Sequence, residues 1–159
     1  MTDTGPSRVD RHEDEIARLY REQRDRLRRL AYLMTGEREV AEEIVHDAFV
    51  RVHRRWDSID TPPAYLRKTV VNLCLAWRSR TAMARERTLP TDDLVDPPEL
   101  DETWALLARL SREQRVALVL RYYEDLPDEE IARVMGCRPA TVRTRIHRAL
   151  SSLRKEMTP

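Results

Sequence analysis

The side chains best suited to binding a ligand are clustered near the C-terminus. Residues 136–155, GCRPATVRTRIHRALSSLRK, carry six fixed positive charges and no negative one. The acidic segment just before them, residues 124–133 (EDLPDEEIAR), contains five acids. Arginine guanidinium groups bind phosphates and the major-groove edge of guanine. Because the whole chain has a formal net charge of only +1, this local sorting of charge predicts that the basic segment contacts DNA.

The residues around Gly136 predict a helix-turn-helix, with helices at 127–135 and 139–153. Val142 and Ile146 belong to an apolar stripe that would hold the second helix from behind, and polar side chains occupy the opposite face. A basic helix that merely faces solvent is the alternative; the acidic first helix, the glycine turn and the two distinct faces favour DNA. The expected groove-facing residues are Ala140, Arg143, Thr144, His147 and Arg148, with Thr141 and Arg145 on the flank.

Helical periodicity extends over nearly the whole chain and predicts an all-α fold. Three glycines and one phenylalanine are too few for a sheet-rich protein. Apolar residues recur at spacings of three and four in two blocks. The expected helices are residues 13–34, 39–56 and 64–80 in the first block, and 101–110, 111–123, 127–135 and 139–153 in the second.

The two blocks predict two small helical domains, residues 13–81 and 101–157, joined by a flexible linker. The linker, residues 82–100, has three prolines, loses the helical period and changes from basic to acidic side chains. Residues 1–12 lack the apolar centre of a signal peptide and are expected to be a disordered lead.

Composition points to a cytoplasmic protein. Apolar residues make up 41% of the chain and charged residues 36%, and no stretch approaches the roughly 20 apolar residues needed to span a bilayer. Cys74 and Cys137 lie far apart in apolar-periodic segments, so both are expected to be free, buried thiols.

Both blocks resemble the sigma-70 family, specifically its extracytoplasmic-function (ECF) group. The stretch ALLARLSREQRVALVLRYYEDLPDEEIARVMGCRPATVRTRIHRALSSLR is similar to region 4 of that family. The stretches RLRRLAYLMTGEREVAEEIVHDAFVRVHRRW and PAYLRKTVVNLCLAWRSR look like regions 2.1–2.2 and 2.3–2.4, respectively. The two resemblances occur in the family's order, with its linker between them.

The resemblance implies a transcription initiation factor with no catalytic site and no cofactor. Core RNA polymerase would be bound through its beta-prime clamp helices and its beta flap, promoter DNA would be read at the −35 and −10 elements, and an anti-sigma factor is an expected partner. A small-molecule substrate and direct insertion into a membrane are not expected. The active protein would be associated with the nucleoid.

The resemblance also assigns site residues. The region 4 helix would read the −35 element through the groove-facing residues named above. Asn72 matches an asparagine that holds a flipped base of the −10 element, and Tyr65 is a candidate for stacking, whereas Trp77 is expected in the core. The phosphate-binding candidates are Arg67, Lys68, Arg78 and Arg80, and the polymerase-binding candidates in AEEIVHD are Glu42, Glu43, His46 and Asp47.

Two other functions deserve comparison. A stand-alone helix-turn-helix regulator, repressor or activator, would bind duplex DNA without polymerase and usually as a dimer, but the sequence has no dimerisation heptad. The doublet His46-Asp47 also occurs in metal-dependent phosphohydrolases, which need further metal ligands. Only His12, His53 and His147 remain for that role, so an enzyme is not expected.

Overall fold

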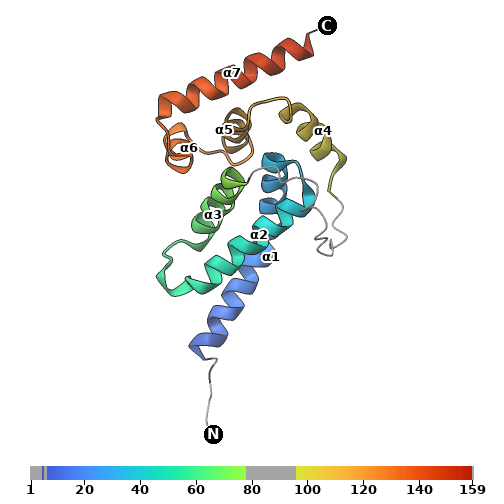
Figure 1. Ribbon diagram of the computed structural model, residues 1–159. Helices are drawn as coiled ribbons and strands as arrows, with labels where there is room; N and C mark the ends of the chain where they lie inside the picture. Colours follow the sequence, from blue (N-terminus) through green and yellow to red (C-terminus); the bar gives the residue numbers. More distant parts are fainter. Residues whose placement is uncertain (1–4, 6, 78–95, 159) are drawn as a thin grey trace.

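The computed structural model describes residues 5, 7–77 and 96–158, and every regular element within them is a helix (Figure 1). The all-α prediction is therefore confirmed. In chain order the elements are α1 (Arg8–Thr35), α2 (Arg38–Arg54), the 3-10 helix η1 (Trp56–Ser58), α3 (Pro62–Ala76), α4 (Pro98–Leu107), α5 (Arg112–Tyr122), α6 (Asp128–Met135) and α7 (Pro139–Met157).

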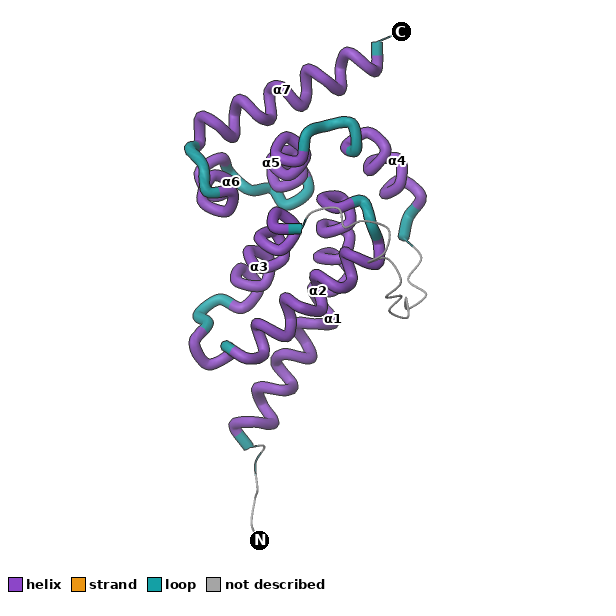
Figure 2. Tube along the Cα trace, viewed as in Figure 1, coloured by secondary structure: helices purple, strands orange, loops and turns teal. Residues whose placement is uncertain are grey.

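The helices form two groups that follow the chain order. Helices α1, α2 and α3 pack on one another, and α5, α6 and α7 do the same, as the tube in Figure 2 shows. Leu30, Val52 and Leu66 are fully buried in the first group. Leu120 and Ile131 are fully buried in the second. The buried residues of each group thus lie at the apolar positions that the helical periodicity of the sequence predicts.

Local capping explains where the first helix begins. The backbone N–H of Asp10 donates to Ser7 Oγ, and the Asp10 carboxylate accepts from the Ser7 N–H, which together form a capping box. Helix α1 therefore begins at Arg8, whereas the sequence predicted a disordered lead over residues 1–12. The apolar period that guided the prediction does not extend to this first turn.

The start of α3 follows from its two prolines. Pro62 and Pro63 occupy the first turn, where amide hydrogens have no helical partner. Thr61 is the N-cap residue but makes no side-chain cap hydrogen bond. The helix ends at Ala76, earlier than the expected residue 80, and Trp77 packs half-buried against the core.

The two groups of helices also pack against each other. Helix α1 contacts α4 and α5, and α3 contacts α6, so the apolar core is continuous across the boundary (Figure 1). Most of the expected linker lies outside the described residues. The side chain of Asp96, near the end of this segment, is buried between the two groups, and α4 already begins at Pro98.

Trp104 of α4 packs against the turn between α1 and α2. Gly36 adopts the left-handed conformation with φ +77°, and a Cβ added to it would overlap the Trp104 indole. The Tyr32 and Trp104 rings lie 6.0 Å apart, and the Arg115 guanidinium stacks over the indole at 4.8 Å. Glycine is needed here both for its backbone angle and for the space it leaves.

We expect Gly36→Ala to destabilise the protein by more than Gly136→Ala. Both glycines have positive φ, which costs another residue about 1–2 kcal/mol, but a Cβ at Gly136 meets open space. Urea unfolding followed by circular dichroism measures both changes. In a Trp104→Ala background the two substitutions should lower the free energy of unfolding by the same amount. If Gly36→Ala still lowers it by more, overlap with the indole is not the cause.

Candidate nucleic-acid and polymerase interfaces

Helix α7 presents the basic face that the sequence indicated. Val142, Ile146 and Ala149 are buried against the neighbouring helices. The side chains on the opposite face reach solvent, and the two flank residues, Thr141 and Arg145, are half-buried. The exposed set is Ala140, Arg143, Thr144, His147 and Arg148.

Local contacts restrict three of these side chains. Arg143 Nη1 lies 3.6 Å from Asp128 Oδ2 at the start of α6, and Arg145 Nη1 lies 3.6 Å from Cys137 Sγ. Thr144 Oγ1 donates to the Ala140 carbonyl at 3.1 Å, which leaves the hydroxyl oxygen free to accept. Arg148 and His147 project from the same face.

Helix α3 carries a second polar face. Asn72 and Lys68 are exposed, one turn apart, and Tyr65 lies half-buried one turn before Lys68. The Tyr65 hydroxyl accepts a hydrogen bond of 3.2 Å from Arg55 Nη1, which fixes the orientation of the ring. The other two basic candidates, Arg78 and Arg80, lie outside the described residues.

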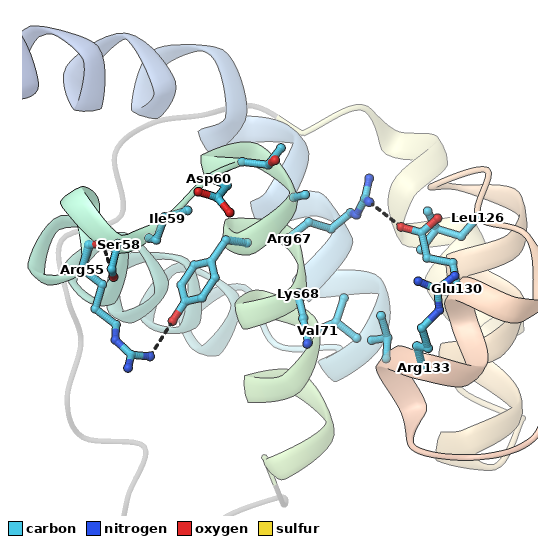
Figure 3. Close-up of a pocket in the computed structure, with 14 residues that line it drawn as sticks. Arg55, Ser58, Ile59, Asp60, Arg67, Lys68, Val71, Leu126, Glu130 and Arg133 are labelled. Atoms are coloured by element: carbon cyan, nitrogen blue, oxygen red, sulfur yellow. Dashed lines mark hydrogen bonds and ion pairs between the residues drawn. The ribbon is translucent and has the colours of Figure 1, made fainter.

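A cavity of about 620 Å³ opens beside this face (Figure 3). The turn that contains Ser58 and Asp60 and the first half of α3 form one side, and Glu130 and Arg133 of α6 form the other. Apolar groups alternate with charged ones around it. The apolar lining includes Ile59, Ala64, Tyr65, Val71, Leu126 and Val134.

Arg67 was expected to bind phosphate, but here it is paired with acids. Its Nη2 donates to Glu130 Oε1 at 3.1 Å, and its Nη1 lies 3.8 Å from Glu124 Oε2 (Figure 3 shows the first pair). Arg26 of α1 approaches the other Glu124 oxygen at 3.2 Å. Burial raises the pKa of Glu124, and the charges of Arg26 and Arg67 oppose that rise.

Asp96 was not singled out in the sequence, yet it has the most arginine neighbours of any acid in the described residues. Arg28 donates two hydrogen bonds to it, at 2.8 and 2.7 Å, Arg38 Nε lies 3.3 Å away, and Arg29 Nε lies 3.6 Å away. Burial alone would raise the pKa of Asp96, but the hydrogen bonds and charges of Arg28 and Arg38 outweigh it, so the pKa lies below its ordinary value. Asp96 is one of several acids in a proline-rich stretch without helical periodicity, so nothing in the sequence distinguished it from the others.

Asp101 extends this network toward α1 and α2. Arg38 Nη2 donates to Asp101 Oδ1 at 2.6 Å, and the Tyr32 hydroxyl donates to the same oxygen at 2.7 Å. Burial and this hydrogen bond raise the pKa of Tyr32 to about 12. The tyrosine is therefore a neutral donor at physiological pH.

Helix α2 displays the acidic face proposed for the polymerase. Glu43, His46 and Asp47 are exposed, opposite the buried Ile44 and Ala48. The fourth candidate lies apart from them: Glu42 is half-buried, and its charge acts on the pKa of Arg28. Three of the four predicted residues thus share one accessible surface.

The cysteines, the possible metal site and the possible membrane span remain to be compared with the sequence. Cys74 is buried, which raises its pKa to about 12, and Cys137 is a half-buried free thiol. Among the described residues no group of three or more His, Cys, Asp and Glu side chains could hold a metal ion. No described helix is both long and apolar enough to cross a bilayer.

Comparison with known proteins identifies both halves. Residues 19–83 match the family model for sigma-70 region 2, and residues 100–153 match that for sigma-70 region 4. The RNA polymerase sigma-E factor of Streptomyces avermitilis is 31% identical over 90% of this chain and 85% of its own. The ECF RNA polymerase sigma factor SigE of Mycolicibacterium smegmatis is 33% identical over 95% of this chain and 66% of its own.

A solved structure supports the fold. The sigma factor RpoE of Bartonella quintana, in complex with the anti-sigma factor NepR, superposes with a TM-score of 0.67 at 21% identity, covering 90% of this chain and 94% of that one. Together with the family matches, these relatives place the chain in a class. The chain belongs to the sigma-70 family of RNA polymerase sigma factors, in its ECF group. It is therefore a transcription initiation factor and not an enzyme.

Proposed function

We propose that this sigma factor binds core RNA polymerase through α2 and reads a promoter with two separate surfaces, the exposed faces of α7 and α3. The observation that carries the proposal is the exposure of all three faces, each backed by a buried apolar stripe on the same helix. Copurification with core polymerase, followed by promoter-specific run-off transcription, tests it.

Helix α7 reads the −35 element in the major groove. Arg143 and Arg148 have the guanidinium geometry for bidentate contacts with guanine, and Ala140 at the start of the helix allows a close approach. Thr144 and His147 contact a base or a phosphate, and Thr141 and Arg145 support the edge of this surface. The contact of Arg143 with Asp128 orients the guanidinium in the absence of DNA.

Helix α3 reads the −10 element as the strands part. The Asn72 amide can both donate to and accept from the edge of an unpaired base. Tyr65 offers a ring for stacking beside the cavity, and Lys68 and Arg67 supply positive charge for the strand's phosphates. Arg78 and Arg80 extend the same basic sequence and remain candidates for phosphate binding.

The acidic face of α2 binds the polymerase. Glu43, His46 and Asp47 form its accessible part, and Glu42 contributes at its edge. We assign this face to the beta-prime clamp helices and the second group of helices to the beta flap. This function places the protein in the cytoplasm, at the nucleoid when it is active. The RpoE–NepR complex supports an anti-sigma factor as a further partner.

Reversing charge on α2 should abolish binding to core polymerase. Glu43→Lys combined with Asp47→Lys removes two acids from an exposed face while leaving the buried side of the helix intact, so folding should be unaffected. Titration of labelled protein with core polymerase measures the affinity. The control is Glu15→Lys with Glu22→Lys, which reverses two exposed acids on α1. Unchanged affinity of the α2 variant would overturn the assignment.

Arg143→Ala should weaken promoter recruitment and relax base preference at one position of the −35 element. A bidentate contact with guanine discriminates by about 1–3 kcal/mol, or roughly ten- to hundredfold. Binding of the holoenzyme to promoters substituted at each −35 position measures this preference. Arg154→Ala removes an exposed arginine farther along the same helix and should leave the preference intact. If both substitutions change the preference equally, Arg143 contributes only positive charge and does not read a base.

Asn72→Ala should leave polymerase binding and −35 preference unchanged but reduce promoter opening, because the amide contributes only after a base is unpaired. Permanganate reactivity of unpaired thymines measures opening. A template with a pre-melted bubble should rescue Asn72→Ala more than Arg143→Ala. If the bubble rescues neither variant, the proposed division between the two surfaces is wrong.

A further inference from the structure

Asp128 lies between two arginines that come from different helices. It is the first residue of α6. Its Oδ1 forms an ion pair with Arg121 Nη2 of α5, and its Oδ2 lies 3.6 Å from Arg143 Nη1 of α7. One carboxylate therefore connects α5, α6 and α7 at the edge of the surface assigned to the −35 element.

The Asp128 carboxylate is held in place, whereas Arg143 reaches into solvent. The Asp128 side chain is 17% exposed and that of Arg121 is 33% exposed, compared with 60% for Arg143. A largely buried charge is unfavourable without its partner, so Arg121 and Asp128 keep each other in this position. The positive end of the α6 dipole also favours an acid in the first turn. Asp128 is thus a fixed group beside a long side chain that would otherwise rotate freely.

The contact leaves a base-reading edge of Arg143 free. A bidentate contact with guanine uses two N–H groups on one edge of the guanidinium. Asp128 approaches Nη1, so the edge formed by Nε and Nη2 remains available. A separation of 3.6 Å is that of an ion pair and is too long for a hydrogen bond. The carboxylate can therefore stay beside Arg143 while the arginine contacts a base.

The other arginine assigned to guanine has no such support. Arg148 is exposed on the same face of α7 and makes no hydrogen bond or ion pair within the part of the chain that the structure describes. A side chain that becomes ordered only on binding loses its rotamer freedom at that step, which weakens the contact, whereas one ordered beforehand loses less. Arg143 should therefore discriminate among bases more strictly than Arg148.

We propose that Asp128 is a positioning residue for the −35 element: held by Arg121, it orients Arg143 and so sets how strictly one base pair is read. The inference rests on the proposed function, in which Arg143 contacts a base, and adds a residue outside the recognition helix that contributes specificity without contacting DNA. Asp128 contributes discrimination and not general affinity, because a negative charge near the phosphates weakens their attraction to this surface.

The test measures binding of the holoenzyme to promoters substituted at each −35 position. Asp128→Asn removes the charge and keeps the size of the side chain. The matched control is Glu129→Gln, which removes an exposed acid at the next position of α6 and with it the same charge near the helix N-terminus. A third variant combines Arg121→Met with Asp128→Asn, so that no uncompensated charge remains at Arg121. Each change is also made together with Arg143→Ala, and circular dichroism measures the folding of every variant.

We expect Asp128→Asn to reduce the preference about three- to tenfold at the position that Arg143→Ala relaxes, and at no other. Affinity for a promoter with a scrambled −35 element should not fall. The variant that also carries Arg121→Met should behave in the same way, and Glu129→Gln should leave the preference intact. In the Arg143→Ala background, Asp128→Asn should have no further effect on it.

Three results would each overturn the role of Asp128: an unchanged preference in both Asp128 variants, an equal loss in Glu129→Gln, or a further loss in the Arg143→Ala background. A loss spread over several −35 positions would likewise show that the carboxylate only stabilises the fold. If Arg143→Ala itself leaves the preference at every position intact, base reading by Arg143 fails, and the positioning role of Asp128 fails with it.

Discussion

The way in which the two groups of helices pack against each other depends on the buried contact between Asp96 and Arg28. This carboxylate lies just before α4 and joins the second group of helices to α1 through two hydrogen bonds. Arg38 and Asp101 extend the contact to the start of α2, and Trp104 then rests on Gly36. A charged contact was required here because the segments that meet are rich in arginine and in acid, and each would be costly to bury alone.

The fold could be predicted from the sequence because its information is local. Apolar periodicity and the Gly136 turn each act within a few residues, and the expected helices form in the predicted order, with ends that differ from the prediction by up to five residues. The first turn of α1 was missed for the same reason: its signal is a capping box between Ser7 and Asp10, not an apolar stripe. The faces of α2, α3 and α7 were likewise readable, since exposure on a helix follows from its period.

The contacts between the two groups could not be predicted in this way. The sequence separates Arg28 from Asp96 by 68 residues and Arg67 from Glu130 by 63, and no period links such pairs. Asp96 looked like one more acid in a proline-rich stretch, and Arg67 looked like a phosphate ligand. Each interpretation considered one element at a time, whereas the partner of an arginine is decided by which surfaces meet. The resemblance to a family supplied roles for separate helices but not their arrangement in this chain.

The near-neutral total charge of the chain corresponds to ion pairs between its arginines and its acids. A protein that binds DNA needs arginines on its surface, and those arginines attract any acid that can reach them. Here the acids that balance the chain's charge include Glu124 and Glu130, which lie against Arg67, and Asp128, which lies beside Arg143. Ion pairs of this kind contribute little net stability because water solvates the separated charges almost as well. Contacts that are specific in geometry yet modest in free energy can be exchanged for phosphates, which bind the same guanidinium groups.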